Sequence, residues 1–190
     1  MSPDDAFRDD DVTVVLLAGG TSRRFGSDKL DAPLRGSTVL ETVVASLPAG
    51  WPLVVVGPAR DVGRVVSRAQ EDPPGGGPLA GVAAGMEHVG TDVVAVVAGD
   101  MPFAGPAVAA LVAALRTAPL DVEAVVATDA SGVPNPLLAA YRTAAVRRVL
   151  PVPAHGRPAR LLLDLAHVEV AVAHPTALDV DTPADLDHLG

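Results

Sequence analysis

Short apolar runs alternate along this chain with segments whose apolar residues recur at helical spacing. The runs are rich in valine and alanine and have the length of strands buried on both faces. They predict strands over residues 12–17, 53–56, 92–98, 123–127, 137–141 and 168–172. The segments between them predict helices over residues 38–46, 61–69, 79–89, 106–116, 143–150 and 159–165. Because strands and helices alternate, we expect a mostly parallel sheet with helices on both faces, a three-layer, Rossmann-like α/β fold.

Local signals mark where several of these helices begin. Thr38 and Glu41 have the spacing of a capping box, which satisfies free amide groups at a helix start. Pro78 suits the first turn of the helix that follows it. Near the C-terminus, Thr182 is expected to cap a short helix, with a proline at the first position and Asp185 at the third.

The stretch 16–29 follows the first predicted strand and is rich in glycine and basic residues. The adjacent Gly19 and Gly20 lack a Cβ, so the backbone amides there can approach an anion closely. Arg23 and Lys29 place positive charge beside these amides. The glycine spacing fits neither a P-loop nor the G-x-G-x-x-G dinucleotide motif. We therefore interpret the stretch as a polyphosphate-binding loop of another kind.

Composition and charge narrow the class of protein. The 190 residues include no cysteine, which excludes disulfides, thiolate metal sites and cysteine nucleophiles. The net charge of −9 argues against nucleic acid as a partner. Residues 1–11 lack the layout of a signal peptide, and no apolar run reaches the roughly 18 residues of a membrane span. We expect a disordered leader over residues 1–11, a single domain over 12–190 and a cytoplasmic location.

The basic residues near the glycine-rich loop form a local cluster in an otherwise acidic chain. Arg23, Arg24, Lys29 and Arg35 belong to it, and Lys29 is the only lysine in the sequence. A compact ammonium can sit between phosphate oxygens, whereas a guanidinium is a planar fork. The single lysine therefore suggests that arginine would not serve at position 29.

Two further loops are expected at the same edge of the sheet. Asp100 comes directly after the buried run 92–98 and Gly99, where ligands of α/β sheets bind. Magnesium takes one or two carboxylates together with phosphate oxygens and waters, which makes Asp100 the predicted ligand. The glycine- and proline-rich segment 71–81 leads into a helix and is expected to face an anion or a base.

The glycine-rich loop also carries a family resemblance. From Leu17 to Lys29 the chain matches L-A-G-G-x-S-x-R-x-G-x-D-K at every fixed position. This stretch resembles the signature loop of the molybdenum cofactor guanylyltransferases, within the GT-A-like nucleotidyltransferases. Segments 77–81 (with the preceding Asp72), 99–102 and 181–186 are similar to further motifs of that family and occur in the same order. Together these segments span nearly the whole chain.

The resemblance implies transfer of GMP from GTP to the terminal phosphate of molybdopterin, which forms the guanine dinucleotide cofactor and releases pyrophosphate. Lys29 and Arg23 would hold phosphates and Asp100 would carry Mg²⁺, so these residues are the implied catalytic group. Such transfer rests on positioning and charge neutralisation, and an ionised phosphate needs no general base to attack. The implied nucleotide-binding residues are Leu17, Ala18, Gly19, Gly20, Lys29, Asp72, Gly81 and Asp100. Partners would be GTP, molybdopterin and, transiently, enzymes that supply or receive the cofactor, with no nucleic acid and no membrane.

The chain departs from the family's pattern at several positions. Asp179 and Asp181 stand where the family often has asparagines, and the extra charge there suits a second metal contact, with Asp181 as the candidate ligand. Asp31 is acidic where small or apolar residues are frequent. No motif fixes the acceptor site, for which His155 and Arg157 are the candidates.

Alternatives of two classes stay open. A cytidylyltransferase, or another nucleotidyltransferase with a small phosphorylated acceptor, is the nearer one. The cytidylyl relatives resemble L-A-A-G at the loop, so Gly19 favours guanine by family pattern. A non-catalytic nucleotide-binding protein on the same fold is the other. The presence of both Lys29 and Asp100 argues against it, because a binding module could dispense with either.

Overall fold

One long sheet organises the structure, a computed structural model that describes the chain except for residues 1–10, 21–27, 130, 174–175, 177 and 190. Its strand order is β5-β4-β1-β6-β8-β7-β9, and β2 and β3 form a separate pair. The strands are β1 (Val12–Leu17), β2 (Pro33–Leu34), β3 (Ser37–Thr38), β4 (Leu53–Val56), β5 (Ser67–Ala69), β6 (Val93–Ala98), β7 (Ala124–Thr128), β8 (Pro134–Arg142) and β9 (His167–Ala171). The helices are α1 (Val39–Ser46), α2 (Pro78–Met86), α3 (Gly105–Thr117), α4 (Thr143–Val149) and α5 (Pro183–Leu189), with 3-10 helices η3 (Lys29–Asp31) and η4 (Ala159–Asp164). The expected leader lies, apart from Asp11, outside the described residues.

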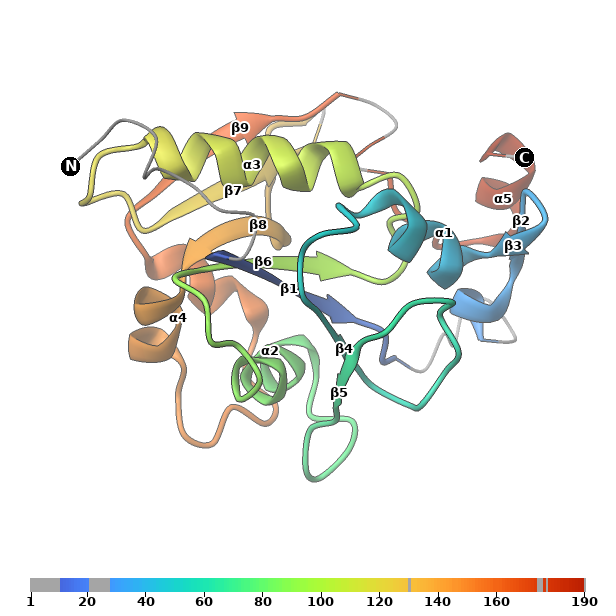
Figure 1. The fold of residues 1–190 in the computed structure, drawn as a ribbon, viewed down its shortest axis with the longest axis horizontal. Helices are drawn as coiled ribbons and strands as arrows, with labels where there is room; N and C mark the ends of the chain where they lie inside the picture. Colours follow the sequence, from blue (N-terminus) through green and yellow to red (C-terminus); the bar gives the residue numbers. More distant parts are fainter. Residues whose placement is uncertain (1–10, 21–27, 130, 174–175, 177, 190) are drawn as a thin grey trace.

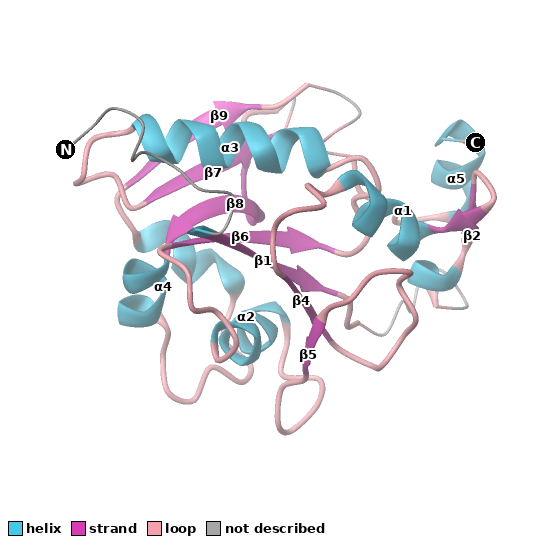
Figure 2. Ribbon diagram, in the orientation of Figure 1, coloured by secondary structure: helices cyan, strands magenta, loops and turns pink. Residues whose placement is uncertain are grey.

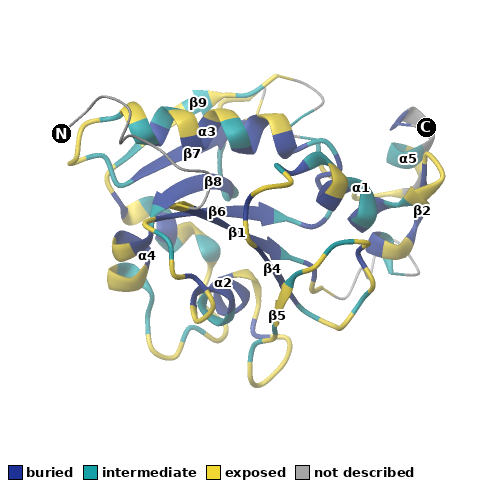
Figure 3. Cartoon of the chain, viewed as in Figure 1, coloured by how far each residue is buried: buried dark blue, intermediate teal, exposed yellow. Residues whose placement is uncertain are grey.

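Helices cover both faces of the long sheet (Figures 1 and 2), and each face has its own apolar core. Val14 and Leu16 of β1 pack on the face that α1 and α3 cover, whereas Val15 packs on the face of α2, α4 and η4. Successive side chains of a strand point to opposite faces, so a continuous apolar run is what a strand buried on both faces requires. Figure 3 shows the buried residues gathered in these central strands and on the inner side of α3. The predicted three-layer α/β fold is confirmed.

None of the helices in the described part of the chain combines the length and the apolar character that a bilayer crossing requires.

β8 is the strand that runs against its neighbours β6 and β7, while the other pairings in the long sheet are parallel. It begins at Pro134, earlier than the predicted 137. Its register with β7 shifts between Val126 and Ala127, and Pro136 lies in the irregular part, where its missing N–H costs no ladder bond. The buried Tyr141 hydroxyl donates a hydrogen bond of 2.8 Å to the Pro136 carbonyl. This bond holds the irregular segment beside the sheet.

The predicted helix over residues 61–69 is wrong. Residues 61–66 form an irregular loop, and β5 follows. Val62 is 3% exposed but Val65 is 97% exposed, so the apolar residues of this segment do not share one buried face. Gly63 has a φ of 64°, in the left-handed region, which interrupts helical geometry.

The predicted helix starts are confirmed, with one change in how the last helix is capped. The Thr38 hydroxyl accepts from the Glu41 amide (3.1 Å), and the Glu41 carboxylate accepts from the Thr38 amide (2.8 Å). Pro78 is the first residue of α2. Before α5, the Asp185 carboxylate accepts from the amide of Thr182 (2.7 Å) and from its hydroxyl (3.0 Å). Asp185, reaching back, is therefore the capping group at this end.

Arg35 ties the C-terminal helix to the body of the protein. Its Nε donates to the Leu189 carbonyl (2.8 Å), and its guanidinium lies 5.0 Å from the ring centre of Phe103. A guanidinium over an aromatic face makes a favourable cation–π contact. These partners are on α5 and before α3, and Arg35 does not line the cleft described below.

Gly105 lets α1 and α3 come together. A Cβ at this position would lie 1.8 Å from the backbone oxygen of Ser46, the last residue of α1. The Gly105 amide also donates to the Ser46 hydroxyl at 3.2 Å. The contact between the two helices therefore depends on the absence of a side chain.

We expect Gly105→Ala to lower the free energy of unfolding by about 1–3 kcal/mol, because the added methyl forces α1 and α3 apart. Urea denaturation followed by circular dichroism measures this. Gly90→Ala is the matched control, since a Cβ at Gly90 meets nothing within 4 Å. Equal stability of the two variants would contradict the packing argument.

Candidate functional site

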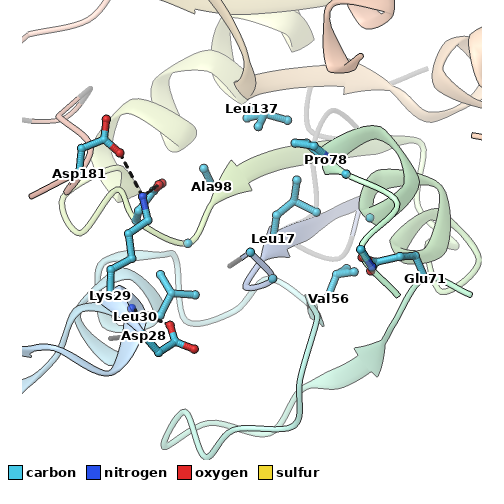
Figure 4. A pocket seen from close by; sticks show the side chains of 17 residues that line it. Leu17, Asp28, Lys29, Leu30, Val56, Glu71, Pro78, Ala98, Leu137 and Asp181 are labelled. Atoms are coloured by element: carbon cyan, nitrogen blue, oxygen red, sulfur yellow. Dashed lines mark hydrogen bonds and ion pairs between the residues drawn. The ribbon is translucent and has the colours of Figure 1, made fainter. Parts of the chain in front are cut away.

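A cleft of about 530 Å³ opens at the carboxyl ends of β1, β4 and β6. Ligands of α/β sheets bind at this edge. Its apolar lining comes from Leu17, Val56, Pro78, Ala98 and Leu137, with charged side chains at its two ends. Figure 4 shows Lys29 and Asp181 at one end of the cleft and Glu71 at the other.

Two glycines let the start of the signature loop pass between the neighbouring strands. A Cβ on Gly57, which follows β4, would lie 2.8 Å from the backbone of Ala18. A Cβ on Gly99, which follows β6, would lie 2.7 Å from the Leu17 carbonyl oxygen. The same backbone is held by hydrogen bonds, from the Gly99 amide to Leu17 (2.9 Å) and from the Ala18 amide to Val56 (2.7 Å). The loop therefore leaves β1 at a fixed place, where Gly19 and Gly20 line the cleft.

Lys29 brings together the charged end of the cleft. Its ammonium lies 2.6 Å from an Asp100 carboxylate oxygen and 3.2 Å from one of Asp181. The C-terminal segment that carries Asp181 is fixed by a hydrogen bond of 2.8 Å from the Val180 amide to the Asp100 carbonyl. Burial lowers the pKa of Lys29, but the hydrogen bonds and charges of both aspartates outweigh it, so its pKa is raised. Lys29 is therefore a cation at neutral pH.

Asp100 and Asp181 fit a magnesium site of the kind that depends on its substrate. Their carboxylates converge on one cation, here the ammonium of Lys29. Among the described residues, no group of three or more His, Cys, Asp or Glu side chains could hold a metal ion. Magnesium needs only one or two carboxylates when phosphates and waters complete its shell.

Asp179 does not share this arrangement. It lines another cavity, of about 240 Å³, together with Thr128 and Asn135. Burial raises the pKa of Asp179, and repulsion from Asp181 and Asp100 adds to the effect. Of the two acidic departures in the tail, only Asp181 lines the cleft.

The opposite end of the cleft is formed by the segment that leads into α2. Gly75, Gly77, Pro78 and Gly81 line it, together with Glu71. The Glu71 carboxylate accepts a hydrogen bond of 3.1 Å from the Gly75 amide, which fixes its position in the loop. Gly77 and Pro78 place the start of α2, with the positive end of its dipole, beside the cleft. Among the described residues, no side chain caps this helix start.

Most of the residues predicted from the sequence meet in this cleft. Leu17, Gly19, Gly20, Lys29, Gly81, Asp100 and Asp181 all line it. Ala18 is fully buried behind the lining, and Asp72 is exposed outside it. Arg23 lies outside the described residues.

The acceptor candidates His155 and Arg157 are exposed and do not line the cleft. The Gly156 amide donates to the Gly76 carbonyl (2.8 Å), and a Cβ on Gly76 would lie 2.7 Å from Nδ1 of His155. This segment therefore supports the loop at the far end of the cleft from behind.

Sequence reasoning did not single out Glu71, Gly57 or Leu137, and it included Asp28 only as a fixed position of the signature motif. Glu71 is adjacent to the predicted Asp72, and the motif alone did not separate the two. Gly57 could have been found as the glycine that ends the strand beside β1. Leu137 enters the cleft through the irregular part of β8, for which the sequence has no clear signal.

A comparison with known protein families identifies the family of this chain. The profile of the MobA-like NTP transferase domain matches residues 14–170 of the chain. The chain belongs to this family.

Sequence relatives of the domain carry a consistent name. A probable molybdenum cofactor guanylyltransferase from Deinococcus radiodurans is 33% identical over 183 residues, which are 94% of this chain and 93% of the relative. Proteins of the same name from Chloroflexus aggregans and Bacillus cereus are each 36% identical, over 140 residues (70% of this chain) and 96 residues (46%). These two alignments span 66% and 48% of the relatives' own lengths.

Solved structures of other proteins share the fold. Molybdopterin-guanine dinucleotide biosynthesis protein A from Archaeoglobus fulgidus superimposes with a TM-score of 0.70 at 25% identity, over 93% of this chain and 96% of that one. Rv0371c from Mycobacterium tuberculosis, in complex with manganese, has a TM-score of 0.68 at 22% identity, over 95% and 97% of the two chains. The GT-A-like nucleotidyltransferase fold is confirmed.

We expect Gly57→Ala to disturb the MobA-like signature loop. The methyl meets the Ala18 backbone, and a φ of 133° strains any residue with a side chain. The free energy of unfolding should fall by about 1–3 kcal/mol, and backbone amide NMR shifts should change at residues 17–20. Gly63→Ala is the control, because its φ is also positive but nothing lies within 4 Å. Shift changes at residues 17–20 of the same size in both variants would refute the clearance role.

Proposed function

We propose that this protein transfers GMP from GTP to molybdopterin, forming the guanine dinucleotide cofactor and pyrophosphate. The observation that carries the proposal is the convergence of Lys29, Asp100 and Asp181 at one end of a cleft that the signature loop lines. The names of the relatives support the substrate pair. The glycine at position 19 supports guanine over cytosine by family pattern.

The cleft suits a nucleoside triphosphate lying along its length. Base and ribose would lie on the apolar middle and toward Glu71, whose carboxylate can accept hydrogen bonds from a base edge that carries donors, as guanine does. The triphosphate would lie against the Gly19 and Gly20 amides and reach Lys29. Arg23 would add a second cation to the phosphates.

The charged end would perform the chemistry by positioning and charge neutralisation. Lys29 would exchange its carboxylate contacts for phosphate oxygens and stabilise charge at the α-phosphoryl group. Asp100, with Asp181 as a second ligand, would hold Mg²⁺. When bound, the metal neutralises phosphate charge. The phosphate of the acceptor is ionised at neutral pH, so no side chain is assigned as a general base.

We expect the protein to bind GTP in the presence of Mg²⁺ at least tenfold more tightly than CTP, ATP or UTP, because each discriminating hydrogen bond is worth about 1–3 kcal/mol. Isothermal titration calorimetry with the four nucleotides measures this. A preference for CTP would instead identify a cytidylyltransferase with the same metal site. Absence of binding to any nucleotide would refute the proposed activity.

We expect Lys29→Met to reduce GMP transfer by about 10²–10³-fold, the usual cost of one group that stabilises transition-state charge. Asp100→Asn should raise the Mg²⁺ concentration that half-saturates the reaction. Pyrophosphate release with GTP and molybdopterin measures both effects. Arg148→Gln is the control, because its ion pair with Glu123 (2.6 Å) lies outside the cleft. Transfer by Lys29→Met at the unmodified rate would exclude the assigned role.

A further inference from the structure

Arg60 joins the two carboxylates that flank Lys29 in the sequence. Its guanidinium forms ion pairs with Asp28 and, at 2.5 Å, with Asp31. Arg60 belongs to the irregular loop between β4 and β5, so its ion pairs join residues that are 29 and 32 positions apart in the sequence. The side chain is only 12% exposed, although both partners reach solvent. Burial lowers the pKa of Arg60, but these two hydrogen bonds outweigh it and raise its pKa.

The two ion pairs fix the turn that carries Lys29 at both of its ends. Asp28 precedes η3 and also accepts a hydrogen bond of 3.1 Å from the Leu30 amide with its other carboxylate oxygen. Asp31 is the last residue of the same 3-10 turn. Lys29 lies between them and points the other way, to Asp100 and Asp181. A planar guanidinium can donate to two separate carboxylates at once, which an ammonium does poorly over such a span.

The pairing also removes negative charge from the cleft. Asp28 lines the cleft near the position proposed for the triphosphate. Without Arg60, Asp28 would be an uncompensated carboxylate beside a polyanionic substrate. Asp31 would add a second unpaired negative charge on the same short turn. Asp31 therefore has a physical partner in this structure.

We propose that Arg60 is a positioning residue, which sets the Lys29 turn and neutralises Asp28 and Asp31 so that a nucleotide polyphosphate can bind. It acts through these two carboxylates and lies outside the cleft lining. The role of Arg60 in nucleotide binding rests on the proposed function. Its role in setting the Lys29 turn does not, because that turn is present in the protein without nucleotide.

The first experiment compares GTP binding with Mg²⁺, by calorimetry, in the unmodified protein, Arg60→Gln and the double variant Arg60→Gln/Asp31→Asn. We expect Arg60→Gln to weaken GTP binding about tenfold, the scale of one lost charge-assisted hydrogen bond. The double variant should recover part of this loss, because it removes one of the two unpaired carboxylates. A purely structural role would give no recovery. Arg148→Gln, which breaks another arginine–carboxylate pair, should bind GTP like the unmodified protein.

The second experiment measures amide hydrogen exchange of residues 28–32 in the free protein, where no nucleotide is involved. Arg60→Gln should accelerate exchange at Leu30 at least tenfold, and Arg148→Gln should not. Unchanged exchange in Arg60→Gln would overturn the proposal whatever the nucleotide results. Two outcomes would overturn the role of Arg60 in binding, even if exchange were faster. In the first, Arg60→Gln binds GTP as tightly as the unmodified protein. In the second, the double variant recovers none of the lost GTP affinity. If the unmodified protein bound no GTP, the proposed function would fail, and the exchange result alone would decide the role of Arg60 in the turn.

Discussion

The ammonium of Lys29 joins three segments that are far apart in the sequence. It is the last residue of the signature loop, and its partners Asp100 and Asp181 follow β6 and precede α5. The Val180–Asp100 backbone bond and the Arg35–Leu189 bond hold the C-terminal segment in place for this contact. One charged contact therefore depends on the sheet, on the hairpin of β2 and β3 and on the last helix together.

Close approach of backbones is the second constraint on the site. The core consists mainly of valine, alanine and leucine, and only 3% of the chain is aromatic. Small side chains let strands and helices approach closely, and at Gly57, Gly99 and Gly105 even a Cβ would collide with neighbouring backbone. Close-packed interiors tolerate such additions poorly. The path of the signature loop is therefore set by the packing of the strands around it.

Charge in the site is balanced locally, although the chain as a whole is acidic. Lys29 and Arg60 each lie between two carboxylates, and together they organise Asp28, Asp31, Asp100 and Asp181. Under the proposed function, a nucleotide polyphosphate at this end of the cleft would meet carboxylates that already have cationic partners. Asp100 and Asp181 would then exchange Lys29 for a metal ion, and Asp28 and Asp31 would keep Arg60.

Elements whose pattern is local could be predicted from the sequence alone. The buried run of β1, the capping box of Thr38 and Glu41, and the start of α2 at Pro78 were predictable, because each depends on residues within one or two turns of the chain. The position of Asp100 and of the first residues of the signature loop at the cleft was predictable, since a loop after a buried parallel strand lies at the carboxyl edge of the sheet. Tertiary structure decided what depends on distant partners. Residues 61–66 form a loop, and Arg60, which precedes it, pairs with Asp28 and Asp31. Glu71 lines the cleft, where Asp72 was expected. His155 lies behind the loop at the far end of the cleft. In each case, the position of the side chain depends on packing between segments that are distant in the sequence. A local sequence pattern does not contain that information.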